Sequence, residues 1–328
     1  MSAPRVLAKD EYTVGWVCAL HTEMAAARGM LDEVHQDLEE QDPSDHNNYI
    51  LGRIHDHNVA VACLPEGIYG TISAATVAKD MLRTFQSIRF GLMVGIGGGA
   101  PSSNHDIRLG DVVVSKPSGT HGGVIQYDRG KTLQDGEFQR TGILGPPPNI
   151  LLSALTRLRA DHEIRSSKIR HYISEMVKKH PRMKGYTCPG DLYDCLYNPE
   201  YDHQNSGSTC ERCDPWQAVK RDAREEADPE IHYGNIASGN QVIKHGVTRE
   251  RLRKELDVLC LEMEAAGLML DFPCLVIRGI CDYADSHKND KWQKYAAATA
   301  AAFAKELLSV LSTKRVLQEK AIVQVSGE

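Results

Sequence analysis

Apolar runs alternate with segments of helical period along the first part of the chain. The run YTVGWVCAL (residues 12–20) is bounded by charge and predicts a buried strand. The next segment, HTEMAAARGML, places Ala and Met at helical spacing and predicts a helix. The runs YILGRI and HNVAVACL then predict two strands, joined as a hairpin through His55, Asp56 and His57.

The same alternation continues beyond this hairpin. The segment GIYGTISAATVAKDMLRTF predicts a helix that starts after a glycine, because its Ala, Val, Met and Leu residues share one side. RFGLMVGIGGG predicts a strand that runs into glycines, and DVVVSK predicts one more. Strands that alternate with helices predict an α/β fold with a mainly parallel mixed sheet flanked by helices. Binding sites in such sheets form at the carboxyl ends of the strands.

The pattern changes over residues 162–230. The helical segment ILLSALTRLRADHEI leads into a stretch rich in turn formers, Cys and Tyr that has no sustained period. We interpret this stretch as an irregular insertion in a single domain over residues 1–328, whose core covers about 12–312. IHYGNIASG then predicts a strand, VTRERLRKEL a helix and WQKYAAATAAAFAKELLSVLSTKRVL an Ala-rich helix. The polar tail (residues 315–328) is a candidate for disorder.

The segment CLEMEAAGLMLDFPCLVIRGICDYAD concentrates acidic residues at the two ends of an apolar unit. Glu262, Met263 and Glu264 are predicted to open a helix of small residues over Ala265–Leu270. FPCLVIRGI then predicts a buried strand that ends at Asp282. Two groups of carboxylates at the mouth of a sheet indicate a site that grips and protonates a small molecule.

Composition excludes several classes of function. Charged residues make up 25% of the 328 residues and apolar residues 41%, and no apolar run reaches the roughly 18 residues of a membrane span. The N-terminal residues lack the apolar stretch of a secretory signal, so we expect a cytoplasmic protein, with the nucleus as an alternative. The net charge of −6, without a long Lys/Arg cluster, argues against nucleic-acid binding.

Four motifs together resemble those of the purine nucleoside phosphorylase and nucleosidase superfamily. They are GIGGGAP, ASGNQVI, LEMEAAG and RGICDYAD. The similarity is greatest to methylthioadenosine/S-adenosylhomocysteine nucleosidases and to fungal domains found with NACHT or ankyrin modules. It covers about residues 12–312 outside the insertion. The resemblance implies a three-layer nucleoside phosphorylase-like fold, cleavage of a purine nucleoside or nucleotide, and a homo-oligomer.

By this resemblance Asp282 is the general acid that protonates the purine base at N7. Proton donation is needed because a purine leaves poorly as an anion. A carboxylic acid held partly desolvated keeps its proton near neutral pH and can donate it. The alternative is that Asp282 caps the next segment.

The resemblance also assigns the groups around the sugar and the nucleophile. Glu264 would hold the 2′ and 3′ hydroxyls of ribose, Met263 would pack under the sugar, and Glu262 belongs to the same binding segment. Glu23 would activate the attacking water. The alternatives are core packing for Met263, a helix N-terminal acid for Glu264 and a solvated first-turn acid for Glu23.

The glycine-rich loop bears on the choice of nucleophile. Gly95, Ile96 and Gly97 are expected to line the sugar pocket, since glycine permits close backbone approach. Phosphorolytic relatives place an Arg and a Ser near such a loop, and VGIGGGAP has neither. Water is therefore the expected nucleophile, although Arg89 and Arg108 could supply charge for phosphorolysis.

The loop ASGNQVI is expected to form the base pocket, with Val242 and Ile243 as its apolar wall. An Asp at position 282, where relatives specific for 6-oxopurines tend to have Asn, fits an adenine-type base. Three alternatives to nucleoside hydrolysis stay open: a phosphorylase, an ATP nucleosidase, and a nucleotide-sensing domain without chemistry.

The insertion holds a candidate metal site. Nine Cys without a secretory signal indicate thiols or a metal site instead of disulfides. Cys210 and Cys213 form the close pair that tetrahedral zinc uses, and Cys188, Cys195 and His203 could complete it. Free thiols in a flexible loop are the alternative. Any zinc would be structural, and catalysis is expected to need no cofactor.

Overall fold

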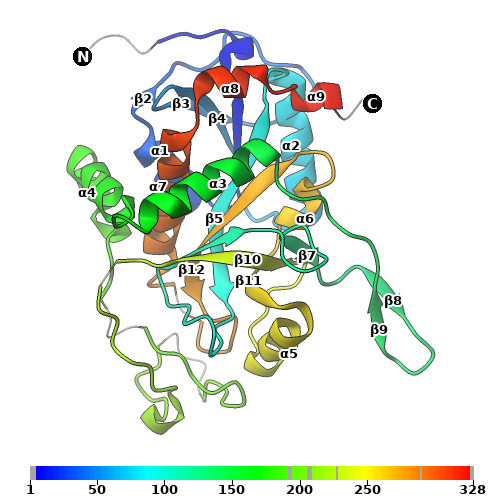
Figure 1. Ribbon diagram of the computed structural model, residues 1–328, viewed down its shortest axis with the longest axis vertical. Coiled ribbons are helices and arrows are strands. Elements are labelled where there is room, and N and C mark those ends of the chain that lie inside the picture. Colours follow the sequence, from blue (N-terminus) through cyan, green and yellow to red (C-terminus); the bar gives the residue numbers. More distant parts are fainter. Residues whose placement is uncertain (1–4, 191–193, 205–208, 227, 289, 326–328) are drawn as a thin grey trace.

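The computed structural model describes residues 5–190, 194–204, 209–226, 228–288 and 290–325 (Figure 1). One sheet runs through its centre in the order β11-β10-β6-β12-β5-β1-β4-β3-β2, and β7 pairs with β10. The strands are β1 Val14–Cys18, β2 Glu33–Val34, β3 Tyr49–Ile54, β4 His57–Cys63, β5 Phe90–Gly99, β6 Val112–Ser115, β7 Val124–Gln126, β10 Ile231–Ser238, β11 Val258–Glu262 and β12 Cys274–Asp282. A separate hairpin, β8 Gly130–Thr132 and β9 Phe138–Arg140, projects from the body.

The strand directions confirm the predicted fold class. β1 runs parallel to β4 and β5, β12 runs parallel to β5, and β10 runs parallel to β6, β7 and β11. The pairs β2–β3, β3–β4, β6–β12 and β5–β11 are antiparallel, so the sheet is mixed. The hairpin predicted around His55 is confirmed as β3 and β4, and His55 takes the positive φ of 51° that a tight turn needs.

Part of the sheet closes on itself. β11 pairs with β10 on one side and with the end of β5 on the other, so β5, β12, β6, β10 and β11 form a ring. Leu261 of β11 lies opposite Gly98 of β5, and Asp282 of β12 lies opposite the same glycine. The ring therefore brings the ends of three strands together at Gly98.

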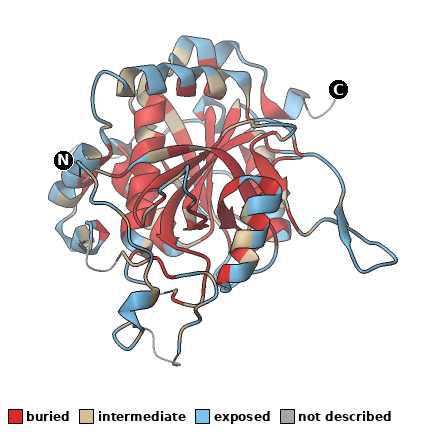
Figure 2. Cartoon of the chain, turned by 60° about the horizontal axis from the view of Figure 1, so that its bottom comes forward, coloured by how far each residue is buried: buried red, intermediate tan, exposed pale blue. Residues whose placement is uncertain are grey.

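Helices cover the sheet on both faces. They are α1 His21–Met30, α2 Thr71–Thr84, α3 Asn149–His162, α4 Ile169–Lys179, α5 Gly246–Leu256, α6 Ala265–Leu268, α7 Gln293–Val310, α8 Thr313–Gln318 and α9 Ile322–Val325. α7 packs on β5, β6 and β12 and carries α1, α3 and α4, while α2 packs on β1 and β4. The buried residues gather in the sheet and on the inner sides of these helices (Figure 2).

Close approach between α7 and β12 depends on small residues. A Cβ atom at Gly279 of β12 would lie 1.8 Å from the carbonyl oxygen of Ala296 in α7, so only glycine fits there. The alanines that follow on α7 are fully buried as well. The Ala-rich composition of this helix therefore lets it lie directly against the strand that ends at Asp282.

The structure differs from the expected elements in three places. VLCLE forms β11, so Glu262 ends a strand, and α6 covers only Ala265–Leu268. The insertion range includes the helix α4, whose buried side is formed by Ile169, Ile173 and Met176. The predicted tail includes helix α9 and most of helix α8, and Val316 and Ile322 are buried against the core.

Within the described residues, no helix combines the length and apolar character needed to cross a bilayer.

Candidate active site

A cavity lies where β1, β5, β11 and β12 end. Residues predicted from separate motifs line it together: Glu23, Ile96, Gly97, Val242, Ile243, Glu262, Met263, Glu264 and Asp282. Gly95 does not line the cavity but lies next to Glu23: a Cβ atom at Gly95 would come within 2.5 Å of a Glu23 oxygen. The closed ring of strands thus brings together side chains that are far apart in the sequence.

Glu23 is held by backbone donors from the residues just before its helix and from β5. It is the third residue of α1, and its Oε2 accepts hydrogen bonds from the backbone N–H groups of Ala19 (2.7 Å) and Leu20 (3.0 Å). Its Oε1 accepts one from Ile96 (2.7 Å). Burial raises the pKa of Glu23, and Arg278 and these backbone donors oppose that rise. Oε2 already accepts two hydrogen bonds, whereas Oε1 keeps a lone pair that can accept a hydrogen bond from water.

Arg278 is the centre of a buried cluster of charges. This fully buried residue of β12 contacts the Glu262 carboxylate through Nη2 and lies 3.4 Å from Oε2 of Glu264. Glu262 also accepts hydrogen bonds from the backbone N–H groups of Glu264 (3.1 Å) and Ala265 (3.0 Å). The carboxylate of Glu262 therefore already has partners within the protein, although the residue borders the cavity.

Glu264 and Met263 face the cavity differently. Glu264 is the N-cap residue of α6, and burial raises its pKa to about 7 even though Arg278 lowers it. Met263 is partly exposed, although its neighbours on both sides are buried. A methionine that merely filled the core would be buried. Its exposure to the cavity is consistent with the predicted contact to a sugar.

Asp282 is buried at the end of β12 and carries a cationic partner. Its Oδ1 accepts a hydrogen bond from the backbone N–H of Ala284 (2.8 Å), and its Oδ2 lies 2.8 Å from Nζ of Lys288. Burial by itself would raise the pKa of Asp282, but Lys288, the thiol of Cys281 and the N–H of Ala284 together lower it. The ammonium group thus stabilises the carboxylate form, whereas desolvation favours the protonated acid expected from the sequence.

Sequence reasoning missed Arg278 and Lys288. Arg278 had a usable signal: it interrupts the apolar run FPCLVIRGI, and an arginine inside a buried strand requires carboxylate partners. Lys288 lies in a polar loop after Asp282, where nothing in the sequence pattern distinguishes it from a surface lysine.

The two predicted base-pocket residues differ in exposure. The side chain of Val242 is 51% exposed, whereas Ile243 is partly buried against a small core cluster that includes Ala237 and Ala284. Both line the cavity. Val242 therefore lies at the rim of the cavity, where it can close over a ligand but does not form a buried wall.

Neither arginine considered for phosphate lines this cavity. Arg89 precedes β5 at the opposite end of the sheet, where its N–H donates to Thr13. Arg108 pairs with Asp106 and borders a different cavity next to the insertion. Among the described residues that line the first cavity, Lys288 is the one with a cationic side chain.

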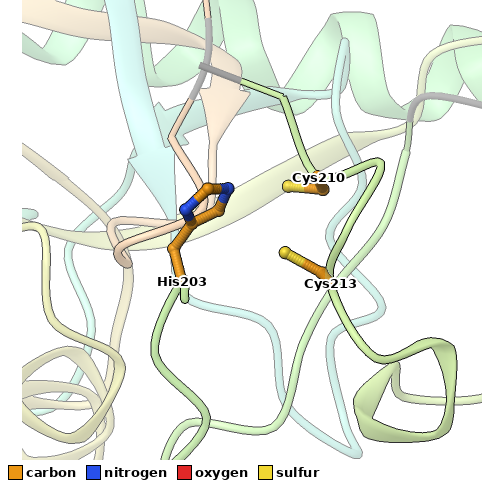
Figure 3. Close-up of side chains that lie close together, drawn as sticks. All are labelled: His203, Cys210 and Cys213. Carbon is orange, nitrogen blue, oxygen red and sulfur yellow. The ribbon is translucent and has the colours of Figure 1, made fainter. Parts of the chain in front are cut away.

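Three of the four predicted metal ligands lie close together. His203, Cys210 and Cys213 place ligand atoms within 4.8 Å of one another (Figure 3). Cys188 does not join this group. Its side chain is exposed and borders the cavity that contains Tyr295.

Comparisons with known proteins cover nearly the whole chain. The family model described as Phosphorylase superfamily matches residues 13–313. A nucleotide-binding leucine-rich repeat (NLR)-like protein of Hyaloscypha variabilis is 48% identical over 316 residues, which are 96% of this chain and 31% of that protein. The chain thus spans about a third of the length of this relative.

Two further relatives match over their full length. The 5′-methylthioadenosine/S-adenosylhomocysteine nucleosidase of Mycobacterium tuberculosis is 25% identical over 308 residues, which are 91% of this chain and 96% of that protein. The solved structure of futalosine hydrolase of Helicobacter pylori matches with a TM-score of 0.58 at 18% identity, covering 91% of this chain and 97% of the other. The structural match shows a shared fold.

Proposed function

The chain belongs to the phosphorylase superfamily, and we propose that it hydrolyses the N-glycosidic bond of a purine nucleoside or nucleotide. One observation carries the proposal: Glu23, Glu264 and Asp282, from three distant segments, line a single cavity. Three carboxylates around one apolar cavity suit a reaction that needs a water-activating base, a sugar ligand and a proton donor. The match to the M. tuberculosis nucleosidase over 91% of the chain supports the same reaction class.

The sugar would be held from the β11–α6 side. Glu264 can accept hydrogen bonds from ribose hydroxyls, and Met263 offers an apolar surface beneath the ring. A carboxylate near the sugar also stabilises the positive charge that develops as the bond to the base breaks. Arg278 keeps Glu264 oriented, because its guanidinium lies 3.4 Å from that carboxylate.

Glu23 would act on the attacking water. Its carboxylate is fixed by three backbone N–H groups, so it can orient a water molecule without moving. The raised pKa of Glu23 makes it a stronger base than an exposed glutamate. The proton from the water would pass to Glu23 as the new C–O bond forms at the anomeric carbon.

The proton for the base would come from the Asp282–Lys288 pair. Nζ of Lys288 lies 2.8 Å from Oδ2 of Asp282. The ammonium group can therefore supply a proton that an ionised carboxylate alone does not have. As negative charge develops on the leaving purine, Lys288 would pass a proton to Asp282, and Asp282 would pass it on to N7. Asp282 is then again ionised, and Lys288 regains its proton from solvent. This arrangement replaces the desolvated acid expected from sequence.

Phosphorolysis is the nearest alternative, because the superfamily takes its description from phosphorylases. Water is favoured because Arg89 and Arg108 lie away from the cavity, and Lys288 is already paired with Asp282. Inorganic phosphate would need cationic partners that these described residues do not supply.

A base-release assay tests the proposal. Purified protein is incubated with adenosine, inosine, methylthioadenosine and ATP, with and without phosphate, and free base and sugar are separated by chromatography. We expect free adenine and an unphosphorylated anomeric carbon, with a rate that does not depend on phosphate. Ribose 1-phosphate would indicate a phosphorylase, and ATP as the preferred substrate would indicate an ATP nucleosidase. Ligand binding without release of base would indicate a sensing domain.

A further inference from the structure

The insertion carries a compact group of soft ligands away from the active-site cavity. Ligand atoms of His203, Cys210 and Cys213 all lie within 4.8 Å of one another (Figure 3). The N–H of Cys213 donates to the carbonyl of Cys210 (3.0 Å), so the Cys-x-x-Cys segment is a tight turn that presents both sulfurs on one side. Figure 3 shows both sulfurs directed toward the imidazole ring of His203.

Other contacts hold His203 in place. Its backbone N–H donates to the hydroxyl of Ser286 (2.9 Å), which in turn donates to Asp202 (3.0 Å). Its Nε2 lies 3.1 Å from the carbonyl oxygen of Thr209, the residue before Cys210. The ring is thus kept beside the two cysteines before any metal arrives, which lowers the entropy cost of binding.

Two further side chains border the group. The thiol of Cys195 lies near those of Cys210 and Cys213. His287 is buried, its ring centroid is 5.5 Å from that of His203, and its carbonyl is 4.0 Å from the sulfur of Cys210. Within the described part of the chain, Nε2 of His287 has no hydrogen-bond partner. A buried imidazole nitrogen without a partner is costly unless it meets a ligand.

We propose that His203, Cys210 and Cys213 bind one zinc ion, with Cys195 or His287 as the fourth ligand. Thiolate and imidazole ligands select zinc over the harder cations, and zinc holds four such ligands in a tetrahedron. A site closed by four protein ligands is structural. The zinc would fix an irregular segment that lacks a helical or sheet framework of its own.

A second group of possible ligands does not support the same conclusion. Asp111, Glu230 and His232 also lie close together. However, both oxygens of Asp111 already bind Arg224, at 2.6 and 2.7 Å. The guanidinium supplies the positive charge that a cation would bring.

The zinc site would also support the active site, and this step rests on the proposed function. Ser286 and His287, which border the zinc ligands, immediately precede Lys288, and Lys288 contacts Asp282. The ring of His287 stacks on Tyr197 of the insertion with centroids 4.0 Å apart. Losing the metal would therefore loosen the segment that holds Lys288 next to the acid.

Metal content tests the proposal without reference to activity. Full-length protein, purified at neutral pH without chelator and dialysed against metal-free buffer, is expected to contain about one zinc per chain by elemental mass spectrometry. Cys210→Ser and Cys213→Ser should each lose at least 90% of that zinc. Cys188→Ser is the matched control: it removes an exposed thiol of the same insertion outside the cluster and should keep the metal. Zinc below a tenth of stoichiometry in the wild type, or a disulfide between Cys210 and Cys213, would overturn the proposal.

Cobalt substitution gives a second measurement, which in the wild-type protein does not depend on how well any variant folds. Wild-type protein stripped by a chelator and refilled with Co²⁺ should show thiolate-to-cobalt charge-transfer absorption. Cys195→Ser and His287→Gln identify the fourth ligand, and one of them should weaken this band and lower zinc retention. If neither does, the site is not closed by four protein ligands and the structural assignment is wrong.

The outcomes for zinc and for catalysis remain distinguishable. Stoichiometric zinc in a protein that releases no base would support the metal site and refute the proposed reaction. Base release that is unchanged in zinc-free protein would refute the coupling to Lys288. Under the proposal, chelation lowers turnover at least tenfold, and added zinc restores it.

Discussion

Replacing Asp282 with asparagine tests the proton donor at the centre of the proposed reaction. The change keeps the size of the side chain and leaves an oxygen that can accept the hydrogen bond from Ala284, now 2.8 Å long. It removes the group that can carry a proton to the base. It also breaks the contact with Lys288, now at 2.8 Å.

The structure allows the two effects to be sized separately. Loss of a general acid lowers turnover by about 100- to 10,000-fold, or about 3–5 kcal/mol of transition-state stabilisation. Breaking a fully buried ion pair costs about 3–5 kcal/mol of folding free energy. The side chain of Lys288 remains 28% exposed and can regain solvent, so we expect a smaller loss of about 1–2 kcal/mol. Turnover should therefore fall far more than stability.

The assay compares two leaving groups. Release of adenine from a nucleoside needs a proton, whereas release of p-nitrophenolate from p-nitrophenyl β-D-ribofuranoside does not. Asp282→Asn should lose at least 100-fold in kcat on the nucleoside and less than about tenfold on the nitrophenyl riboside. Asp271→Asn, an exposed acid before the same strand, is the control and should behave as wild type.

Equal losses on both substrates would refute the reasoning, because a proton donor matters only when the leaving group needs a proton. A loss below tenfold on the nucleoside would show that the acid is elsewhere. Thermal unfolding of each variant separates these outcomes from simple loss of folded protein.

Three further changes test other parts of the site and fold. Glu23→Gln should lower kcat about 100-fold or more, and a variant with over a tenth of wild-type kcat would contradict the role of Glu23. In the wild type, kcat/KM should fall on acidification at a pH above the usual glutamate range, because Glu23 must be ionised and burial raises its pKa. Lys288→Met removes the group from which Asp282 takes its proton, so Asp282 alone must hold that proton and the alkaline fall of kcat/KM should move to a lower pH than in the wild type; an unmoved profile would show that the pair does not set it. Gly279→Ala should lower the free energy of unfolding in urea by about 3 kcal/mol, because the new Cβ atom would meet the backbone of α7. Gly145→Ala, which has open space around it, is the control and should change that free energy little. Equal urea midpoints for the two variants would argue against the close contact between β12 and α7.

Sequence patterns predicted most strands and the acids, but not how the acids are held. The motifs around Glu23, Glu264 and Asp282 identified side chains that share a cavity. β11 was missed because VLCLE follows a helix directly and is too short to show a period. The contact of Lys288 with Asp282 depends on how a loop folds back, and no local periodicity encodes that.

The closed ring of strands fixes one part of the cavity wall, while another part lies outside the strands and can change in sequence. Glu262, Asp282 and the glycines of β5 are locked in register, and a slip of one residue would turn each side chain to the opposite face of the sheet. The stretch from Gln241 to Ile243 lies outside the paired strands at the rim. Mutations that accumulate in this stretch can retune which base or 5′ substituent is accepted while bond cleavage itself is preserved. We therefore expect substrate preference to diverge among relatives faster than reaction chemistry.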